Sequence, residues 1–203
     1  MQRRKKVKLI LGITGTIGSG KSTVARMFET GDSLLIDADK LAHESFRTGS
    51  PVYKKIVAFF GEGILGRAKR IDRAKLARIV FVNRTALERL NKIVHKSVIA
   101  DIRRMIRDSD KSLIILDAAL ILESKLKKMV DELLVVKAGK EQRILRSKER
   151  LGLSRREVLD RMKYQISQGA KLRLADFIID NSGSMSKTRR QVSETMRKLG
   201  ICG

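Results

Sequence analysis

GTIGSGKS, at residues 15–22, is the most informative segment of this chain, and it follows an apolar run from Lys8 to Ile13. It matches the phosphate-loop pattern G-x-x-x-x-G-K-[ST], with a strand-like run before it and an amphipathic helical continuation after it. The glycines let the backbone bend so that successive N–H groups point at phosphate oxygens, and the N-terminus of the following helix adds a partial positive charge. The segment therefore predicts a binding site for a nucleoside triphosphate at the end of a buried strand.

Two side chains of this loop have a specific role in phosphate chemistry. Lys21 can reach the β- and γ-phosphates, and the Ser22 hydroxyl can join the shell of a Mg²⁺ ion that bridges the same two phosphates. We expect the nucleotide-binding residues of the loop and its flank to be Thr16, Ile17, Gly18, Ser19, Gly20, Lys21, Ser22 and Thr23.

Four further apolar runs predict the other strands of a sheet. They occupy residues 34–36, 113–116, 133–136 and 177–179, and the first is the weakest. Because the runs are continuous rather than alternating, we expect strands that are covered on both faces, as in a parallel sheet. Helical patterns lie between them, which predicts an α/β fold with a doubly wound, five-stranded parallel sheet of the P-loop NTPase type.

The helical patterns have recognisable starts. The longest covers residues 85–107 and begins with a capping-box pair, Thr85 and Glu88. A second capping box, in the segment SRRE at 154–157, predicts a helix over 155–165. The last helix is marked by an apolar stripe formed by Val192, Met196 and Leu199. Residues 51–107 contain no strand-like run, so we expect a helical insertion outside the sheet.

Three carboxylates follow strand-like runs, which is where ligands bind in open α/β sheets: Asp37, Asp39 and Asp117. A carboxylate there can accept a proton from a hydroxyl that attacks the γ-phosphate, or it can be a solvated loop residue or helix cap. Asp117 ends the run LIILD as a Walker-B-like Mg²⁺ ligand would. Ala118 follows where a motor ATPase would usually have glutamate, and there is no N-K-x-D segment of a guanine-specific switch. Small-molecule phosphoryl transfer is therefore favoured.

The composition is strongly basic, since 45 Lys and Arg against 22 Asp and Glu give a net charge of +23 in 203 residues. Such a charge suits either a protein that handles polyphosphates or a nucleic-acid binder. Aromatic residues make up only 4% of the chain, which disfavours a base-stacking surface. The hydrophobic content of 42% is enough for a folded core and excludes the disordered class.

The remaining composition predicts a cytoplasmic protein. The single cysteine, Cys202, excludes an internal disulfide and a cysteine-based zinc site. No apolar run approaches the roughly 18 residues of a membrane span, and the run after the basic N-terminus is too short for a signal peptide. We expect no membrane partner, and the oligomeric state stays open.

In their order along the chain, these motifs resemble the dephospho-CoA kinase family. The family pattern G-[LI]-T-G-G-I-G-S-G-K-S is similar to GITGTIGSGKS at 12–22, and D-x-P-L-L-F-E is similar to DAALILE at 117–123. The other matching segments are IDADKLAH at 36–43, His95 in a segment like L-H-P, RILRSKER at 143–150, Gln165, Lys171 and ADFIIDNSG at 175–183. The chain departs from the pattern at three positions, Thr16 in place of glycine and Lys96 and Ala119 in place of proline.

The resemblance implies an ATP- and Mg²⁺-dependent kinase that phosphorylates the ribose 3′-hydroxyl of dephospho-CoA. It implies that Asp39 is the general base and Asp37 is structural, and that Thr14 faces the same pocket, although Thr14 can also be a plain strand end. Asn181 is expected to line the adenine pocket, with a simple turn residue as the other interpretation. The residues expected on the acceptor side are Asp39, His95, Asp117 and Glu123; a lone helical histidine is, however, more often structural.

The same resemblance divides the chain into a nucleotide-binding core, an insertion that binds the acceptor, and an arginine-rich helical lid. The core comprises residues 1–50, 108–140 and 174–203, the insertion 51–107 and the lid 141–173. Arg146 and Arg150 are four residues apart, hence on one helix face, and they are the expected catalytic cations; a solvated basic face is the alternative. Two other functions stay open, namely another P-loop nucleoside or nucleotide kinase and a basic nucleic-acid-binding NTPase.

Overall fold

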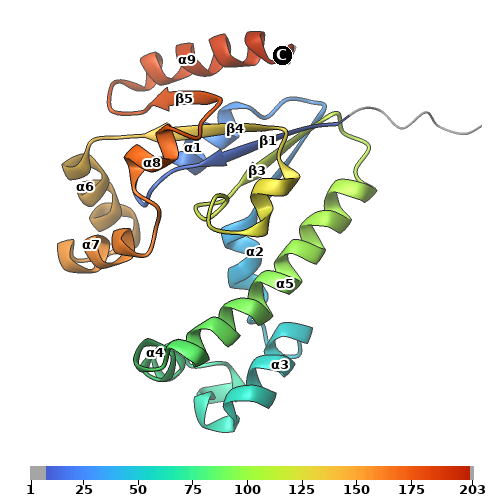
Figure 1. Ribbon diagram of the computed structural model, residues 1–203, viewed down its shortest axis with the longest axis vertical. Helices are drawn as coiled ribbons and strands as arrows, with labels where there is room; N and C mark the ends of the chain where they lie inside the picture. The colour runs from blue at the N-terminus through green and yellow to red at the C-terminus, as the bar shows by residue number, and fades with distance from the viewer. Residues whose placement is uncertain (1–7, 202–203) are drawn as a thin grey trace, which may run out of the picture. The chain divides into compact units, whose positions relative to one another are not determined.

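The computed structural model describes residues 8–201, apart from the side chain of residue 81, and contains a five-stranded sheet in which all strands are parallel (Figure 1). The strand order is β2-β3-β1-β4-β5. The strands are β1 (Leu9–Thr14), β2 (Ser33–Asp37), β3 (Leu113–Asp117), β4 (Glu132–Lys137) and β5 (Phe177–Asp180). Each lies at one of the predicted apolar runs, so the predicted five-stranded parallel sheet is confirmed.

Both faces of the inner strands β3, β1 and β4 are buried over most of their length, which explains why these strands appear as continuous apolar runs in the sequence. On one face, strand side chains such as Leu11 and Ile115 pack with Val24 of α1 (Lys21–Met27), with Phe28 at its C-cap, and with Val192 of α9 (Met185–Lys198). α9 also lies along β5 (Figure 1). On the other face, a Cβ atom on Gly12 would stand 2.6 Å from the Val130 side chain, so this face of β1 is covered directly by the chain that precedes β4.

Three helices between β4 and β5 form the segment expected to be the lid. They are α6 (Lys140–Leu151), α7 (Arg155–Lys163) and α8 (Gln168–Leu172); a short 3₁₀ helix, η3 (Lys125–Met129), precedes β4. The capping box predicted at Ser154 and Glu157 is present, and Leu153 and Val158 are buried in one apolar cluster. The helix ends at Lys163 rather than at Gln165, because Tyr164 already makes the C-cap.

The chain divides into two compact units, and the second comprises residues 38–108. Its helices are α2 (Ala38–Glu44), α3 (Pro51–Phe60), η1 (Glu62–Ile64), η2 (Arg67–Lys69), α4 (Arg73–Val82) and α5 (Arg84–Asp108). Their buried side chains form an apolar core that includes Val52, Ile56, Ile64, Val98 and Ile102. The unit begins earlier than the boundary expected at Pro51, because α2 packs against α5.

The predicted capping box at Thr85 and Glu88 is wrong. α5 begins at Arg84, and the side chain of Asn83 accepts a hydrogen bond from the Ala86 N–H (3.0 Å), so Asn83 caps the helix. The Glu88 carboxylate instead accepts a hydrogen bond from Arg84 Nε (3.0 Å). Two hydrogen-bonding residues close together at a helix start allow two capping registers, and only the structure distinguishes them.

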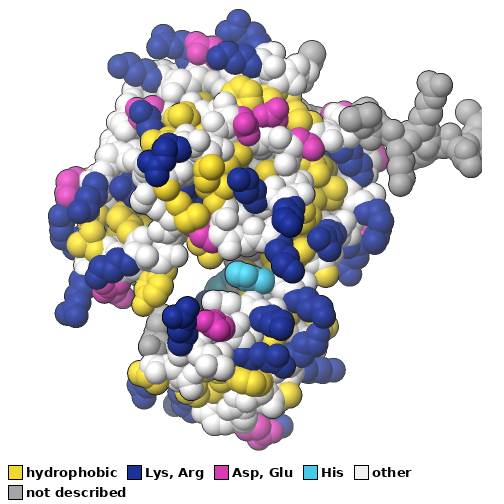
Figure 2. All heavy atoms as spheres, viewed as in Figure 1, with side chains coloured by type: hydrophobic (Ala, Val, Ile, Leu, Met, Phe, Trp, Pro, Cys, Tyr) yellow, Lys and Arg dark blue, Asp and Glu magenta, His cyan; other side chains and the backbone are white. Residues whose placement is uncertain are grey.

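Basic side chains are scattered over the visible surface of each unit, with fewer acidic ones between them (Figure 2). The basic run from Arg3 to Lys6 and the single cysteine, Cys202, lie outside the described residues. Among residues 8–201, no helix is both long enough and apolar enough to cross a membrane.

Candidate active site

The phosphate loop connects β1 to α1, and its backbone requires glycine at two positions. Gly18 and Gly20 have φ angles of 77° and 86°, in the left-handed region that other residues rarely adopt. A Cβ atom on Gly18 would lie 2.2 Å from the carbonyl oxygen of Arg143, and one on Gly20 would lie 2.2 Å from Nδ2 of Asn181. Both the backbone angle and the close neighbours therefore exclude a side chain at these positions.

The backbone N–H groups of the loop fall into two sets. Those of Gly18 and Gly20 donate to no acceptor within residues 8–201 and are available to phosphate oxygens. The N–H of Ile17 donates to the side-chain oxygen of Gln165 (3.0 Å), and that of Ser19 donates to a carbonyl within the loop (3.0 Å). The loop is thus held by the rest of the protein through some amides and leaves others for a ligand.

A buried ion pair lies beneath the loop. Lys21 Nζ is 2.8 Å from Oδ1 of Asp117, the last residue of β3. Burial raises the pKa of the Asp117 carboxyl, while the Lys21 ammonium and a hydrogen bond with the Ser22 hydroxyl oppose the rise. Asp37 ends the neighbouring strand in register with Asp117, and its negative charge adds to the rise. Two carboxylates, an ammonium and a hydroxyl therefore meet at the carboxyl edge of the sheet.

These oxygen atoms suit a hard cation such as Mg²⁺. Magnesium in nucleotide sites is usually held by one or two carboxylate or hydroxyl oxygens together with waters and substrate phosphates. Ser22 and Asp117 supply such oxygens next to the loop. Within the described part of the chain, no group of three or more His, Cys, Asp or Glu side chains can hold a metal by itself. The donor set therefore fits a cation that is shared with a nucleotide.

Asn181, directly after β5, ties the loop to the far side of the site. Its Nδ2 donates to the carbonyl of Ser19 (2.9 Å), and its Oδ1 accepts a hydrogen bond from Thr188 (3.0 Å). The Asn181 carbonyl accepts a hydrogen bond from Arg146 Nη2 (3.0 Å) of α6. The second terminal nitrogen of Arg146, Nη1, is buried and has no partner among the described residues. It lies 4.0 Å from the Cβ position of Gly20, so this unpartnered donor faces the phosphate loop.

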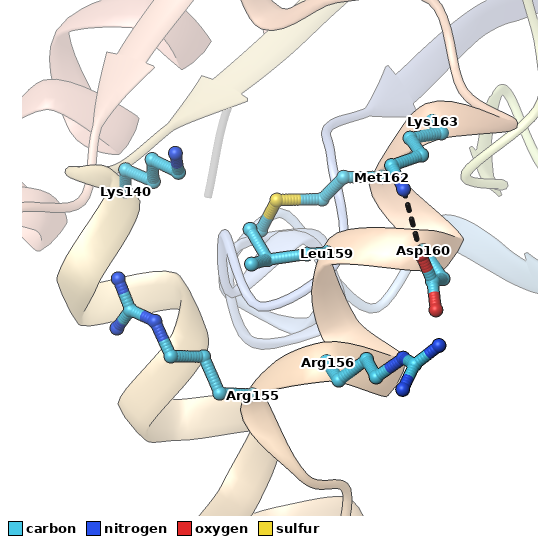
Figure 3. Close-up of a pocket in the computed structure, with 7 residues that line it drawn as sticks. All are labelled: Lys140, Arg155, Arg156, Leu159, Asp160, Met162 and Lys163. Atoms are coloured by element: carbon cyan, nitrogen blue, oxygen red, sulfur yellow. Dashed lines mark hydrogen bonds and ion pairs between the residues drawn. The ribbon is translucent and has the colours of Figure 1, made fainter.

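The lid carries more positive charge farther from the loop. Arg150 is exposed near the end of α6. An open pocket of about 710 Å³ lies between α6 and α7 (Figure 3), and its lining residues are Lys140, Arg155, Arg156, Leu159, Asp160, Met162 and Lys163. Arg155 makes a two-point ion pair with Glu141 (2.6 and 2.9 Å), and this pair links the two helices. The charge of Arg155, one of the exposed basic residues of the lid, is therefore paired within the lid itself.

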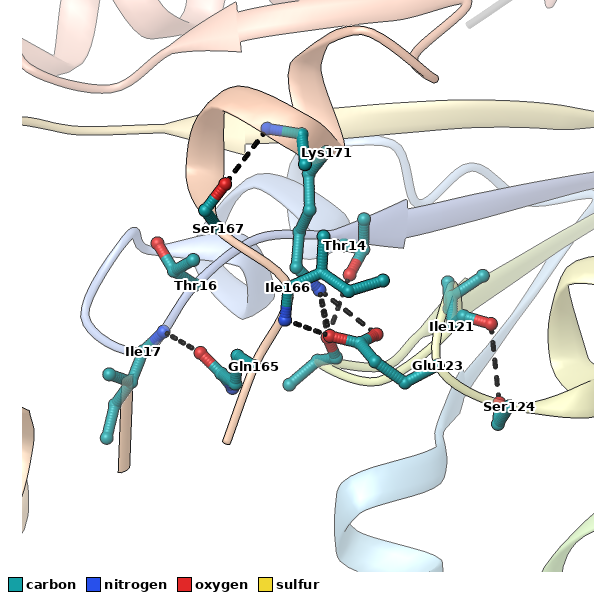
Figure 4. A network of polar contacts seen from close by, with 12 residues as sticks. Thr14, Thr16, Ile17, Ile121, Glu123, Ser124, Gln165, Ile166, Ser167 and Lys171 are labelled. Carbon is teal, nitrogen blue, oxygen red and sulfur yellow. Dashed lines mark hydrogen bonds and ion pairs between the residues drawn. The ribbon is translucent and has the colours of Figure 1, made fainter. Parts of the chain in front are cut away.

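A second polar network joins the loop, the segment after β3 and the start of α8 (Figure 4). Lys171 is fully buried, and its Nζ donates to the carbonyl of Ala119 (2.7 Å) and lies 3.0 Å from Oε1 of Glu123. The same carbonyl accepts a hydrogen bond from the Thr14 hydroxyl (3.1 Å), and Glu123 accepts another from the Ile166 N–H (2.9 Å). This network fixes Thr14 and Glu123, two expected site residues, to the end of the lid.

Two expected site residues belong to the second unit. Asp39 lies in the first turn of α2, and His95 lies in the middle of α5, where burial lowers its pKa. The unit has its own open pocket of about 660 Å³ with the lining residues Lys40, His43, Glu44, Phe46, Arg47, Thr48, Arg70, Ile71 and Arg73. His43, expected to be solvated, is exposed at this pocket. A basic pocket of this kind suits an anionic ligand.

The structure gathers most of the expected residues of the first unit around the phosphate loop. They are Thr14, Thr16, Ile17, Gly18, Ser19, Gly20, Lys21, Ser22, Thr23, Asp117, Arg146 and Asn181. Sequence reasoning assigned no role to Arg143, whose Nη1 donates to the Thr16 hydroxyl (2.7 Å). It also had no role for Gln165 or Lys171 beyond their place in the family pattern. Nothing in the local sequence distinguishes these side chains, because their contacts are made by residues more than 45 positions away.

Comparison with known proteins identifies the family of this chain. The family model for dephospho-CoA kinase matches residues 9–187. The dephospho-CoA kinase of Carboxydothermus hydrogenoformans is 42% identical over 192 residues, which cover 93% of each chain. Among solved structures, TT1252 from Thermus thermophilus has a TM-score of 0.83 and 32% identity, and the match covers 96% of this chain and 99% of that one. The dephospho-CoA kinase of Campylobacter jejuni has a TM-score of 0.67 and 27% identity, over 95% and 98%.

The family pattern in the sequence, the glycine loop above a lysine–aspartate pair, and the extent of these matches all lead to one assignment. The matches cover almost the whole chain and almost the whole length of the relatives, so the resemblance is not confined to the common phosphate loop. We conclude that this chain belongs to the dephospho-CoA kinase family.

Proposed function

We propose that the protein transfers the γ-phosphoryl group of ATP to the ribose 3′-hydroxyl of dephospho-CoA, with coenzyme A and ADP as products. The observation that carries this proposal is the buried Lys21–Asp117 pair under a loop with available N–H groups, in a chain of the dephospho-CoA kinase family. In phosphoryl transfer, catalysis consists mainly of positioning and of stabilising the negative charge of the transferred group. The protein supplies donors and cations for both tasks around the loop.

On the nucleotide side, the N–H groups of Gly18 and Gly20 bind phosphate oxygens, and Lys21 turns from Asp117 toward the β- and γ-phosphates. Ser22 and Asp117 would hold Mg²⁺, and the bound ion would neutralise charge on the phosphates. Asn181 holds the Ser19 carbonyl in place beside the adenine end of the nucleotide.

On the acceptor side, the Asp39 carboxylate accepts the proton of the ribose 3′-hydroxyl as its oxygen attacks the γ-phosphorus. The bond between the γ-phosphorus and the bridging oxygen breaks, and ADP leaves with the electron pair. His95, whose lowered pKa keeps it neutral near pH 7, contacts the acceptor as a hydrogen-bonding group. Glu123 and Thr14 shape the acceptor segment through the Ala119 carbonyl and Lys171 rather than by direct proton transfer.

The lid arginines stabilise the transition state and keep water away from the phosphates. Arg146 has the better position, because its unpartnered Nη1 already faces the phosphate loop. Arg150, on the same face of α6 one turn later, is exposed and reaches the nucleotide only after the lid moves. We further expect the protein to act in the cytoplasm, where both substrates are available.

The decisive test measures ADP release in a coupled assay with ATP and Mg²⁺, with dephospho-CoA, with nucleosides, or with buffer alone. We expect dephospho-CoA to stimulate ADP release strongly and the product to carry the phosphate on the 3′-oxygen, as determined by ³¹P NMR. Stimulation by nucleosides but not by dephospho-CoA would point to another small-molecule kinase. Equal ADP release with and without dephospho-CoA would refute the proposal.

A further inference from the structure

The first lid helix, α6, is packed directly against the phosphate loop. The Gly18 backbone is so close to α6 that a Cβ atom there would meet both the Arg143 carbonyl (2.2 Å) and the Ser147 hydroxyl (2.7 Å). The Ser147 hydroxyl donates a hydrogen bond to that same carbonyl (2.7 Å), so this buried hydroxyl has a hydrogen-bond partner. α6 and the loop therefore share one continuous packing surface, and the conformation of the loop depends on the position of the helix.

Arg143 is an unusual residue at this surface. Its side chain is almost completely buried, with 8% exposure, yet no carboxylate of the described residues pairs with it. Its Nη1 donates to Thr16 Oγ1 (2.7 Å) and has a weak contact with the sulfur of Met162 (3.8 Å), while Nε has no partner within residues 8–201. Burial lowers the pKa of the guanidinium, but arginine remains charged in proteins. The hydroxyl of Thr16 is therefore the one oxygen acceptor that the described residues offer to this buried cation.

Position 16 is also one of the three positions at which the chain departs from the family pattern, which has glycine there. Unlike Gly18 and Gly20, Thr16 does not have a positive φ angle, so its backbone accepts an ordinary side chain without strain. The threonine side chain is buried, with 4% exposure, against α6. A glycine at this position would have no atom to accept the Arg143 hydrogen bond.

We propose that Thr16 and Arg143 form a brace between the phosphate loop and α6, and that this brace sets the affinity of the loop for the phosphates of ATP. Both are positioning residues: Thr16 acts through Arg143, and Arg143 acts through the loop backbone. The proposal rests on the assignment of the loop as the ATP site. It adds a determinant of nucleotide affinity that lies in the lid helix and is formed by this chain's own threonine.

Two physical effects connect the brace to ATP rather than to the acceptor. The glycines give the free loop many accessible conformations, and a loop that is already held in its binding conformation loses less entropy when the phosphates bind. The Arg143 charge has no counter-ion in the described structure and lies in a medium of low dielectric constant, so its field favours an anion at the loop. Without the Thr16 hydroxyl, the buried guanidinium has to move toward water or toward another acceptor, and it displaces α6 and the loop when it moves.

The test is a double-mutant cycle with Thr16→Val, Arg143→Met and the double variant, in the full-length protein. The quantity measured is the dissociation constant of a non-hydrolysable ATP analogue with Mg²⁺, by isothermal titration calorimetry without dephospho-CoA. Valine keeps the shape of threonine and removes only the hydroxyl. Because a hydrogen bond to a charged group is strong, each single substitution should raise the dissociation constant about tenfold. The double variant should also raise it only about tenfold, because both substitutions remove the same interaction. Thr16→Ser, which restores the acceptor, should bind within about twofold of the unchanged protein.

Several controls separate this effect from a general loss of structure. Thr85→Val, at an exposed position of α5, should leave ATP-analogue binding unchanged, and the KM for dephospho-CoA should stay the same in every variant. Thr16→Gly is the second variant in case valine disturbs the packing, and it should match Thr16→Val. The proposal is overturned by unchanged binding in Thr16→Val and Thr16→Gly, by effects of Thr16→Val and Arg143→Met that multiply, or by an equal rise in the KM for dephospho-CoA. If ATP binds but dephospho-CoA is not phosphorylated, the proposed function is refuted. The binding data still test the proposal of the brace, because they do not depend on the reaction.

Discussion

The two units of this protein treat their charged residues in opposite ways. In the first unit, charged side chains are buried around the phosphate loop: Asp117 beneath it, Arg143 beside it, and Lys171 in the network behind it. In the second unit, no charged or polar side chain of residues 38–108 is fully buried, position 81 aside, and its ion pairs are exposed. Arg84 and Glu88, for example, pair with side-chain exposures of 92% and 65%.

This difference supports the proposal that the chemistry takes place on the first unit and that the second unit recognises the acceptor. Burying a charge is costly unless it is paired or serves a ligand, so a concentration of buried ions marks the part of the molecule that meets the polyphosphate. An apolar core with charges on the outside instead makes a stable platform whose surface can contact an acceptor. We therefore expect substitutions of buried charges in the first unit to have large effects, and comparable substitutions in the second unit to have small ones, apart from Asp39.

The largest effect is expected for Lys21→Ala. The substitution removes the cation that is proposed to bind the phosphates, and it leaves the buried Asp117 carboxylate without its ammonium partner. We expect kcat/KM for ATP to fall about a thousandfold or more in the coupled ADP-release assay, because stabilisation of phosphate charge is the main catalytic contribution. Lys198→Ala, at an exposed position in the last turn of α9, is the matched control and should leave kcat/KM for ATP unchanged. Similar kinetics in both variants would contradict the role of Lys21.

The next largest effect is expected on the free energy of unfolding, and it is tested by breaking one ion pair in each unit. Lys171→Met leaves the Glu123 carboxylate without its buried partner and should lower the free energy of unfolding by about 3 kcal/mol. Arg84→Met breaks an exposed pair and should cost less than about 0.5 kcal/mol. Urea unfolding followed by circular dichroism measures both. Addition of Glu123→Gln to Lys171→Met should recover part of the loss, and equal losses in the two single variants would remove the distinction between the units.

Asp39→Asn tests whether the second unit contributes directly to the chemistry. The amide cannot accept the proton of the acceptor hydroxyl, so kcat should fall about a hundredfold. The affinity for an ATP analogue, measured by calorimetry, should not change, because Asp39 is assigned to the acceptor. Asp108→Asn, an exposed aspartate at the end of α5, serves as the control. An unchanged kcat in Asp39→Asn would remove Asp39 from the role of general base.

The smallest effect is the pH dependence contributed by His95. Burial lowers the pKa of this histidine below its ordinary value of 6.5. Between the two pKa values, His95 is therefore protonated in the unfolded chain and neutral in the folded chain. Stability should therefore fall as the pH drops from about 6.5 toward the lowered folded-state pKa. Urea unfolding at about pH 7.5 and about pH 5.5 should show a smaller loss in His95→Gln than in the unchanged protein. An identical loss in both would show that His95 is solvated.

The local sequence was sufficient to predict the sheet and the loop. Short continuous apolar runs are typical of strands in a parallel sheet, and the spacing of Gly15, Gly20 and Lys21 is typical of a phosphate loop. Helix starts were less certain: the capping box at Ser154 was predicted correctly, whereas the one at Thr85 gave way to Asn83. Both kinds of feature depend on residues within a few positions of each other.

The site beyond the loop could be predicted only in part. The carboxylates at strand ends follow from the rule that ligands bind at the carboxyl edge of a parallel sheet, and Asp37 and Asp117 do lie there in register. The assignments of Asp39, His95, Arg146, Arg150 and Asn181 came from the family resemblance, and their catalytic and binding roles stay predictions. No periodicity or spacing could have indicated that Gln165 would hold the Ile17 amide, because the two residues are 148 positions apart.

By itself, the sequence determined the order of the strands and helices, the phosphate loop and the kind of ligand that this loop binds, because each of these depends on short-range chemistry that a few neighbouring residues contain. Only the tertiary structure decided which of the many basic residues have a specific place. Of the 45 Lys and Arg, it buries Lys171 against Glu123 and Arg143 against Thr16, and it turns Arg146 toward the loop. The physical reason is that burial and pairing depend on contacts between distant segments, and these exist only after the helices have packed onto the sheet.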